Sequence, residues 1–519
     1  MTREQVDVSS SERATLYDVI IRKGWVVDGT GGEPIRADVA VKDGKIAKVG
    51  VIDDDTGTQV IDAAGLMVSP GFIDIHTHAD GNLLKHPDAW NYLSQGVTTA
   101  IGGNCGGSPL PIHDYRDRAI SAELGINLGL LVGHNTVRRK AMGTEDRAPT
   151  SEELTQMKTS VEEAMAEGAF GLSSGLKYIP GAYARTEEVT ELARVAARSG
   201  GVYATHMRDE GLDLIASVQE SIKIGEDAEI PLQISHLKST STSLWEKVGA
   251  VLGMIDDARA SGQDVTFDQY PYTASSTGLT VLFPAWSLEG GSKGFTKRWG
   301  EPDIRRKIRE GIVHNLLEDR GGGDPANVVV VTSPYDASFN GRDLKAITAE
   351  FFDEVTLENV AETAIRLAES GRHACIFHCI NEDNVREIMQ HPAGLIASDS
   401  HIVTPDEAYP HPRNFGTFPR VLGHYVRELG VLSLTEAVRK MTGAVAQRLG
   451  MNQRGTVAEG NWADLVVFDP DEIGDLATWT EPKETAVGMH YVFVNGEMAI
   501  DKGQPTGGMV GGFLKRGDR

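Results

Sequence analysis

The chain has 519 residues, of which 40% are hydrophobic and 24% charged, a composition typical of a soluble globular protein with room for more than one domain. Its net charge of −24 argues against nucleic acid or an anionic membrane as a partner, because both require a basic face. The 3 cysteines are too few for a disulfide framework, and no signal peptide or membrane-spanning apolar run is visible. We therefore expect a cytoplasmic protein.

The two ends of the chain have similar patterns. Residues 1–16 are predicted to be a loose polar tail, and residues 17–66 to form short β-strands separated by Gly and Asp-Gly turns. The same strand pattern returns in residues 450–519. We predict that both flanks build one small β-sandwich domain. A chain that leaves a domain and returns to it implies an inserted central domain, expected at residues 67–449.

The central region alternates short apolar runs with amphipathic helical stretches. The apolar runs are residues 72–76, 97–102, 128–132, 169–173, 202–205, 231–235, 265–270 and 394–398. Alternating strands and helices of this kind predict an α/β fold with a (β/α)₈, TIM-like barrel. The long stretch between the seventh and eighth strands, about residues 280–392, is expected to be an inserted subdomain or lid over the barrel mouth.

Potential metal ligands follow five of the predicted strands. They are His76 and His78, Cys105, His206, His236 and Asp399. Residues i and i+2 of an extended segment point to the same side, so the two histidines of the "HTH" motif are expected to act together. Barrel enzymes place their chemistry at the C-terminal ends of the strands, where these side chains would meet. Imidazole, thiolate and carboxylate groups suit zinc, and their number allows a second metal.

Each of these residues also has a simpler interpretation. An isolated buried histidine such as His206 is more often held by hydrogen bonds, and a lone cysteine such as Cys105 is usually inert. Asp399 could cap a helix. The shared position at strand ends favours the metal site, because independent structural residues have no reason to gather there.

Several long motifs run from about residue 20 to residue 495. Among them are "GFIDIHTH", "GGNCGGSP", "THMRDEG", "ISHLKS", "DQYPYTASST" and "HPRNFGTFPRVLG". In these motifs the chain resembles the amidohydrolase superfamily and, within it, the N-acyl-D-amino-acid deacylases, or D-aminoacylases. The resemblance implies a zinc-dependent enzyme whose partner is a small molecule, an N-acyl-D-amino acid. It would be hydrolysed at its amide bond to a carboxylate and a free D-amino acid.

The resemblance also implies metal-binding roles. Cys105, His206 and His236 would hold one tightly bound zinc ion, and His76 and His78 a possible second, weaker metal. Cys105 and Asp399 could bridge or contribute to both sites. Many members of the superfamily use a carboxylated lysine after strand four as the bridge. Here Lys177 lies beyond the end of that strand, which favours Cys105 for this role.

For the chemistry, Asp399 is predicted to accept a proton from water and later donate it to the leaving amine. The resemblance places Lys238 and Arg413 at the substrate carboxylate. Hydroxyl donors are expected from Tyr178, Tyr270 and Ser276. A surface salt bridge for Arg413 and a solvated Lys238 are the simpler alternatives. The preference for D-amino acids rests on the resemblance alone.

Some residues depart from the family pattern or have no assigned role. Ser400 and His401 follow Asp399 where a glycine is usual. His134 is expected to face the site. Cys375, His378 and Cys379 either bind a metal or, as we expect, pack inside the inserted segment.

Two other functions compete with this interpretation. A cyclic-amide hydrolase, such as a hydantoinase or dihydroorotase, would use the same metals but usually carries the carboxylated lysine. A non-catalytic scaffold would be expected to have lost ligands, whereas all the ligand positions are filled here. The preferred side chain and acyl group, the number of metals in turnover and the oligomeric state are left open by the sequence.

Overall fold

The computed structural model describes residues 17–52, 57–291, 297–404, 407 and 409–518. Alternating strands and helices make up its centre and β-strands its two ends, so the fold is of the α/β class. The predicted tail at residues 1–16 lies outside the described residues. No helix in the described part of the chain is long and apolar enough to cross a membrane.

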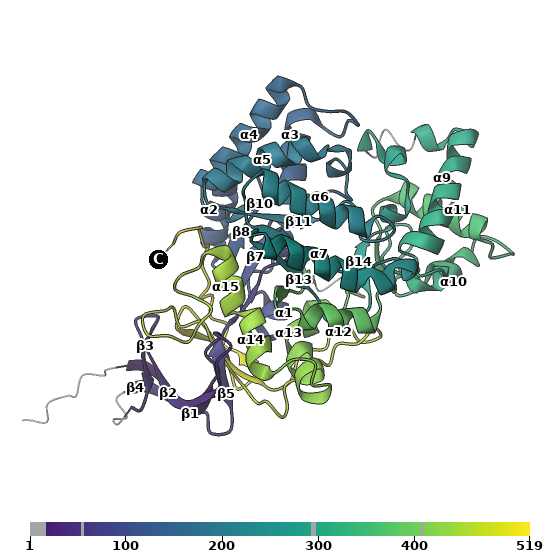
Figure 1. Cartoon of the computed structure of the whole chain (residues 1–519). Helices are drawn as coiled ribbons and strands as arrows, with labels where there is room; N and C mark the ends of the chain where they lie inside the picture. The colour runs from purple at the N-terminus through teal and green to yellow at the C-terminus, as the bar shows by residue number, and fades with distance from the viewer. Residues whose placement is uncertain (1–16, 53–56, 292–296, 405–406, 408, 519) are drawn as a thin grey trace, which may run out of the picture.

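Strands from both ends of the chain share one 9-stranded sheet, in the order β21-β20-β19-β18-β5-β1-β2-β3 with β4 beside β1. Their bounds are β1 Tyr17–Val26, β2 Ile35–Lys42, β3 Lys45–Gly50, β4 Gly57–Asp62, β5 Met67–Pro70, β18 Leu465–Phe468, β19 Met489–Val494, β20 Glu497–Asp501 and β21 Gln504–Pro505. Antiparallel pairing of β5 with β18 joins the two halves. Tight Asp43-Gly44 and Asn495-Gly496 turns, all at positive φ, connect neighbouring strands as such dipeptides predict. In Figure 1 strands β1–β5 lie at one end of the molecule.

The central strands form two parallel sheets. One has six strands in the order β17-β13-β12-β11-β10-β9, and the other has three in the order β6-β7-β8. Their bounds are β6 Phe72–Asp74, β7 Val97–Gly102, β8 Asn127–Leu130, β9 Val132–Gly133, β10 Gly171–Gly175, β11 Val202–His206, β12 Leu232–Ile234, β13 Val265–Gln269 and β17 Gly394–Ile396. Each predicted apolar run overlaps one of these strands. The predicted closed barrel, however, is not found among the described residues.

The two gaps between these sheets have physical causes. Beside β8, the C-terminal segment takes the place of a neighbouring strand: Leu128 N donates to Gly512 O at 2.9 Å, and Leu514 N donates to Leu128 O at 2.8 Å. On the opposite side, an isolated parallel bridge between Thr77 and Ser400 joins the segments that follow β6 and β17, and Ser398 N donates to Asp74 Oδ1 at 3.0 Å. On both sides of the three-stranded sheet the pairing is thus reduced to a few backbone hydrogen bonds, such as Phe170 N to Leu130 O at 2.8 Å and Asp399 N to His76 O at 2.9 Å.

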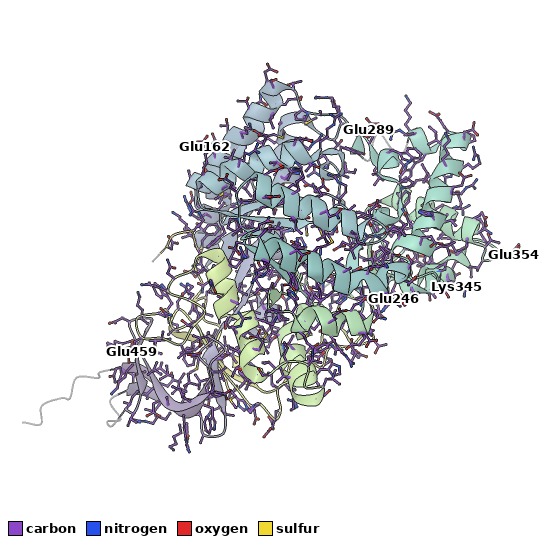
Figure 2. The ribbon with its side chains drawn as sticks, viewed as in Figure 1. Glu162, Glu246, Glu289, Lys345, Glu354 and Glu459 are labelled. Atoms are coloured by element: carbon purple, nitrogen blue, oxygen red, sulfur yellow. The ribbon has the colours of Figure 1, made fainter. Side chains whose placement is uncertain are left out.

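Helices follow most of the parallel strands and cover them. Those before the inserted segment are α1 Trp90–Leu93, α2 Ile112–Ala122, α3 His134–Met142, α4 Ser151–Ala166, α5 Thr186–Arg198, α6 Leu214–Asp227 and α7 Val248–Ala260. Helix α5 is amphipathic, since Val189, Leu192 and Ala196 are buried at helical spacing. Charged side chains such as Glu162 and Glu246 lie exposed at the periphery of the molecule (Figure 2).

The segment between β13 and β17 forms a unit of its own. It contains a three-stranded antiparallel sheet in the order β14-β16-β15. Its elements are β14 Ser275–Gly278, β15 Val328–Thr332, β16 Ala374–Phe377, α9 Pro302–His314, α10 Leu344–Thr348 and α11 Leu357–Ser370. Helices α9–α11 lie at the opposite end of the molecule from strands β1–β5 (Figure 1). The chain continues through α12 Glu382–Gln390, α13 Arg413–Arg420, α14 Leu434–Met441 and α15 Gly443–Leu449.

Candidate metal centre

Cys105 lies at the middle of a cluster of imidazoles. Its Sγ is 3.3 Å from His76 Nε2, 3.6 Å from His206 Nδ1 and 3.7 Å from His236 Nε2. A tetrahedral zinc ion bound at ordinary distances holds its sulfur and nitrogen ligands about 3.6 Å apart. The donor atoms and their spacing therefore fit a zinc ion bound by Cys105 and the histidines around it.

Asp399 extends this cluster. Its Oδ1 lies 3.2 Å from His78 Nε2 and 3.6 Å from His76 Nε2. Three overlapping groups have all their ligand atoms within 4.8 Å of one another: His76, His78 and Cys105; Cys105, His206 and His236; and His76, His236 and Asp399. The structure thus brings together all the side chains that were predicted from the sequence to be metal ligands.

Three of these residues have an unusual backbone conformation. Cys105, His236 and Asp399 stand at φ values of +51°, +36° and +52°. Such left-handed residues cost about 1–3 kcal/mol each and tend to occur at functional sites, where the surrounding structure holds them in place. Beside Cys105, a Cβ on Gly106 would meet Asn135 Oδ1 at 2.1 Å, which explains the glycine at that position.

Buried carboxylates stand behind the histidines, and sequence reasoning missed both of them. Glu210 Oε1 is 2.8 Å from His236 Nδ1, and Glu210 Oε2 is 3.7 Å from His206 Nε2. Asp268 Oδ1 lies 3.3 Å from His76 Nδ1, without hydrogen-bond geometry. The available signals were the spacing of Glu210 four residues after His206 and the position of Asp268 at the end of β13.

The charges of the cluster favour a cation. Burial alone would raise the pKa of the Cys105 thiol, but His76 and the other imidazoles bring this pKa well below its usual value, which favours the thiolate form that binds metals. Burial lowers the pKa of His76, yet Cys105 and Asp268 raise this pKa well above its usual value. His78 behaves similarly, because Asp399 and Cys105 outweigh burial and raise its pKa to about 10. The negative charges that raise the pKa values of these two histidines would also attract a metal ion.

Arg413 lies directly beside the cluster. Its Nη1 donates to Asp399 Oδ2 at 2.8 Å, and its guanidinium packs 4.8 Å over the ring of Tyr270. Its Nη2 makes only a long 3.5 Å contact with Ser276 O. Its Nε is buried and has no hydrogen-bond partner among the described residues. Arg413 therefore holds Asp399 with one nitrogen and leaves its Nε–Nη2 edge largely free.

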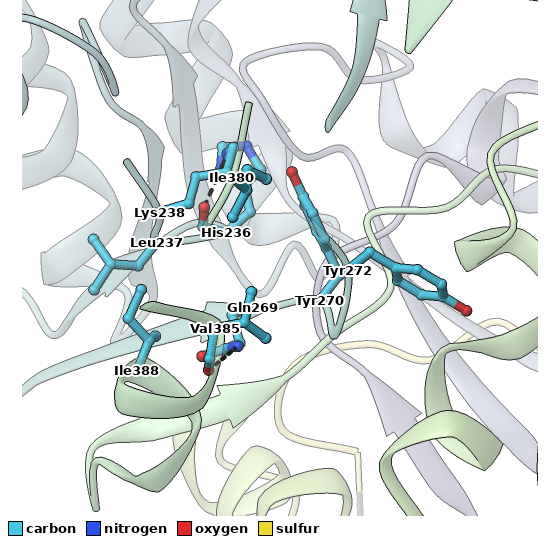
Figure 3. A pocket seen from close by; sticks show the side chains of 9 residues that line it. All are labelled: His236, Leu237, Lys238, Gln269, Tyr270, Tyr272, Ile380, Val385 and Ile388. Carbon is cyan, nitrogen blue, oxygen red and sulfur yellow. Dashed lines mark hydrogen bonds between the residues drawn. The ribbon is translucent and has the colours of Figure 1, made fainter. Parts of the chain in front are cut away.

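Lys238 is the second residue predicted to bind the substrate carboxylate. Its side chain contacts residues of the metal cluster and their neighbours. Its Nζ contacts Glu210 Oε1 and lies 3.0 Å from both the carbonyl oxygen and Nδ1 of His236 (Figure 3). It also lies 5.5 Å over the ring of Tyr270. Lys238 is thus buried and ion-paired, and the alternative of a solvated lysine is wrong.

The predicted hydroxyl donors surround the same place. Tyr178 packs against His206 with ring centroids 4.6 Å apart, and its hydroxyl lies 3.0 Å from Thr277 Oγ1. The Tyr270 hydroxyl is buried without a hydrogen-bond partner among the described residues. Ser276 lies in β14 and accepts the long contact from Arg413 through its carbonyl oxygen.

A small cavity adjoins these residues on the side of α12. His236, Lys238, Tyr270 and Val385 contribute to its lining, and its volume is about 10 Å³ (Figure 3). This volume holds about one water molecule and no substrate. The side chain of His78 is 42% exposed, whereas that of His76 is fully buried. A substrate would therefore reach the cluster from the side of His78.

Two other residues that the sequence analysis considered for the site lie outside the cluster. Lys177 Nζ contacts Asp209 and lies 3.3 Å from Asp319 Oδ2, which leaves it no bridging position. His134, expected to face the site, instead places Nε2 at 2.9 Å from Glu188 Oε1.

The residues after Asp399 and the cysteines of the inserted segment have structural contacts. Ser400 accepts a backbone hydrogen bond from His78 N at 2.7 Å. His401 Nε2 lies 2.9 Å from Glu407 Oε2. Cys375 and Cys379 are buried free thiols and, within the described residues, belong to no group with metal-site spacing.

Comparison with known proteins identifies the family of the chain. The profile of the amidohydrolase family matches residues 59–282 and 336–500, which is more than half of the chain. The chain belongs to the amidohydrolase family. The recognition made from the motifs is therefore confirmed at the level of the family.

Members of this family similar to the chain include two enzymes from Alcaligenes xylosoxydans xylosoxydans. A D-aminoacylase is 36% identical over 96% of this chain and 98% of its own length. An N-acyl-D-glutamate deacylase is 35% identical over 94% and 95%. Among solved structures, N-acyl-D-glutamate deacylase from Bordetella bronchiseptica is 34% identical with a TM-score of 0.83, covering 96% of this chain and 99% of that one. It is complexed with zinc and a phosphonate inhibitor that mimics the tetrahedral reaction intermediate.

Proposed function

We propose that this chain is a zinc-dependent deacylase that hydrolyses the amide bond of N-acyl-D-amino acids to a carboxylate and a free D-amino acid. The observation that carries this function is the ion pair between Asp399 and Arg413 beside the Cys105–histidine cluster. On this proposal the carboxylate would transfer protons and the neighbouring cation would bind the substrate carboxylate. Family membership and the two Alcaligenes deacylases support the same activity.

Cys105, His206 and His236 would hold the tightly bound zinc, and His76 and His78 a second, weaker metal. Asp399 lies within reach of both groups. When bound, zinc polarises the amide carbonyl and increases the acidity of water. Lys177 is ion-paired with Asp209 and Asp319, which argues against a carboxylated lysine that bridges two metals. Because cyclic-amide hydrolases usually have that bridge, the ion pairs also argue against the cyclic-amide alternative.

Asp399 would move the protons of the reaction. Its Oδ1 faces the histidines and its Oδ2 is held by Arg413, so the carboxylate is fixed in the cluster. It accepts a proton from the attacking water and delivers it to the amide nitrogen. An amine leaves poorly unless it is protonated, so this second transfer matters as much as the first.

Arg413 would grip the substrate carboxylate through Nε and Nη2. The same pair of nitrogens on Arg208 binds the Glu220 carboxylate at 2.9 Å each, which illustrates the two-point geometry. A second contact from Lys238 or the hydroxyls of Tyr178 and Tyr270 would fix the α-carbon at more than two points. Such a fixed arrangement distinguishes the D form from the L form.

The fold that would carry this chemistry is a (β/α)₈ barrel with interruptions. Strands β8 and β9 are separated only by Leu131, and when they are counted as one strand the two parallel sheets contain eight strands, which supports this proposal. The proposed domain organisation is a small β domain of residues 17–66 and 450–519 and a catalytic domain of residues 67–449, with an inserted segment at about 280–392.

A substrate panel with metal analysis tests the function. N-Acetyl D-amino acids, their L forms and cyclic amides such as hydantoins would be assayed on protein of measured zinc content. We expect release of free D-amino acids only, with about one or more zinc ions per chain, and loss of activity after chelation that added zinc restores. Hydrolysis of the cyclic amides alone would assign the alternative activity, and an inactive protein without zinc would contradict the proposal.

A further inference from the structure

We propose that Glu210 is a positioning residue that orients both histidines of the tight zinc site and, at the same time, Lys238 of the substrate site. This inference rests on the proposed zinc-dependent function. Glu210 comes four residues after His206, just beyond β11, and only 1% of its surface is exposed. A carboxylate this deeply buried requires partners of opposite charge or hydrogen-bond donors.

The two histidines present different nitrogens to Cys105. His206 faces it with Nδ1 and His236 with Nε2. A metal-bound histidine must carry its remaining proton on the other nitrogen, so the ligating form has the proton on Nε2 in His206 and on Nδ1 in His236. Glu210 stands at both of these opposite nitrogens.

Each carboxylate oxygen of Glu210 contacts one of the two histidines. Oε1 lies 2.8 Å from His236 Nδ1, an ion-pair contact whose negative charge favours a proton on Nδ1. Oε2 lies 3.7 Å from His206 Nε2, an electrostatic contact to a nitrogen with no other hydrogen-bond partner among the described residues. One carboxylate can therefore set the tautomer of both ligands.

Lys238 completes the arrangement. Its ammonium contacts the same Oε1 and also donates to the carbonyl oxygen of His236 at 3.0 Å. If His236 Nδ1 carries a proton for Glu210, it cannot accept one from Lys238, so the third ammonium hydrogen stays available. Glu210 thus connects zinc ligation with a donor for the substrate carboxylate.

The backbone around Glu210 is also fixed. Thr240 N donates to Glu210 O at 2.8 Å, which ties the loop after β11 to the loop after β12. A Cβ on Gly211 would meet Asp319 Oδ1 at 1.7 Å, so the inserted segment packs directly against this turn. Glu210 is thereby held in place independently of a bound metal.

The test replaces Glu210 by Gln, which keeps the shape and one acceptor but removes the charge. Zinc retention would be measured by competition with a chelator, and the absorption spectrum of the cobalt-substituted protein would report ligand geometry. We expect zinc retention to fall about 10- to 100-fold and the cobalt spectrum to change. In the zinc-saturated variant we expect KM for an N-acetyl-D-amino acid to rise, because Lys238 loses the negatively charged partner that orients it.

Glu220→Gln is the matched control. Glu220 is also ion-paired, with Arg208, but has no contact with the metal-site histidines in the described structure. Zinc retention in Glu210→Gln equal to that of the control would overturn the inference. If Glu210→Gln does not fold, Glu210→Asp keeps the charge but shortens the reach, and wild-type zinc retention in that variant would overturn it too. Retention needs no substrate, so an inactive wild-type protein that binds zinc contradicts the proposed substrate and leaves this test intact.

Discussion

Arg413 donates a 2.8 Å hydrogen bond from Nη1 to Oδ2 of Asp399, and both side chains are buried. Burial alone would raise the pKa of Asp399, but Arg413 and His78 hold this pKa well below its usual range. The proposed proton carrier is therefore ionised and oriented before a substrate arrives. Since the pair is buried, removal of either partner leaves a charge without compensation, at a cost of about 3–5 kcal/mol.

Asp399→Asn should separate catalysis from metal binding. Asparagine keeps the size of the side chain and can still face His78, but it cannot accept and return a proton. We expect kcat to fall by about 10²- to 10⁴-fold, while zinc at the proposed tight site of Cys105, His206 and His236 is retained. Activity measured together with metal content checks this. Near-normal kcat in a zinc-loaded variant would remove Asp399 from the mechanism.

Arg413→Lys should affect recognition of the substrate carboxylate. Lysine can retain the charge beside Asp399 but cannot form the two-point contact of the Nε–Nη2 edge. We expect KM for an N-acetyl-D-amino acid to rise roughly 10- to 100-fold, since hydrogen bonds to charged groups contribute about 1.5–3 kcal/mol.

A substrate without the carboxylate provides the control for Arg413. The corresponding N-acetyl-D-amino acid amide should be a poor substrate of both wild type and variant, with little difference between them. An equal loss with the acid and the amide would show that Arg413 acts only through Asp399.

The charges of the site predict a neutral substrate side chain. Buried or half-buried cations around the cluster are already paired: Lys238 with Glu210, Arg413 with Asp399, Arg320 with Asp319, and Lys177 with Asp209 and Asp319. A second carboxylate on the substrate would have to share one of these cations with the acidic partner that already offsets its charge. We expect kcat/KM for N-acetyl-D-leucine to exceed that for N-acetyl-D-glutamate by at least about tenfold, equivalent to about 1.4 kcal/mol. Equal or reversed values in a competition assay would contradict this charge argument.

Two neighbouring glycines test the contribution of the C-terminal segment. A Cβ on Gly511 would meet Ile126 O at 2.1 Å, whereas a Cβ on Gly512 would meet only Asn127 Oδ1 at 3.8 Å. Gly511→Ala should push the segment away from β8 and destabilise the protein by about 1–3 kcal/mol. Gly512→Ala should stay within about 0.5 kcal/mol of wild type in urea or thermal unfolding. Equal stabilities of the two variants would show that this pairing contributes little.

The sequence by itself determined the local features of the site and its family. The "HTH" motif, the glycine-flanked Cys105 and the polar residues at apolar strand ends could be recognised because each depends on neighbours in the chain. The alternation of strand and helix likewise predicted the α/β class, since periodicity is a local property. Parallel strands place their carboxyl ends on one edge, and so the ligands could be predicted to converge.

Only the tertiary structure decided the contacts between distant segments. Glu210 and Asp268 stand behind the histidines, Arg413 pairs with Asp399, and the C-terminal segment pairs with β8 instead of a neighbouring strand. No periodicity marks these contacts, because a buried charge or a strand edge can be satisfied by any segment that packing brings near. Such partners depend on the packing of the whole chain, which a local pattern does not contain.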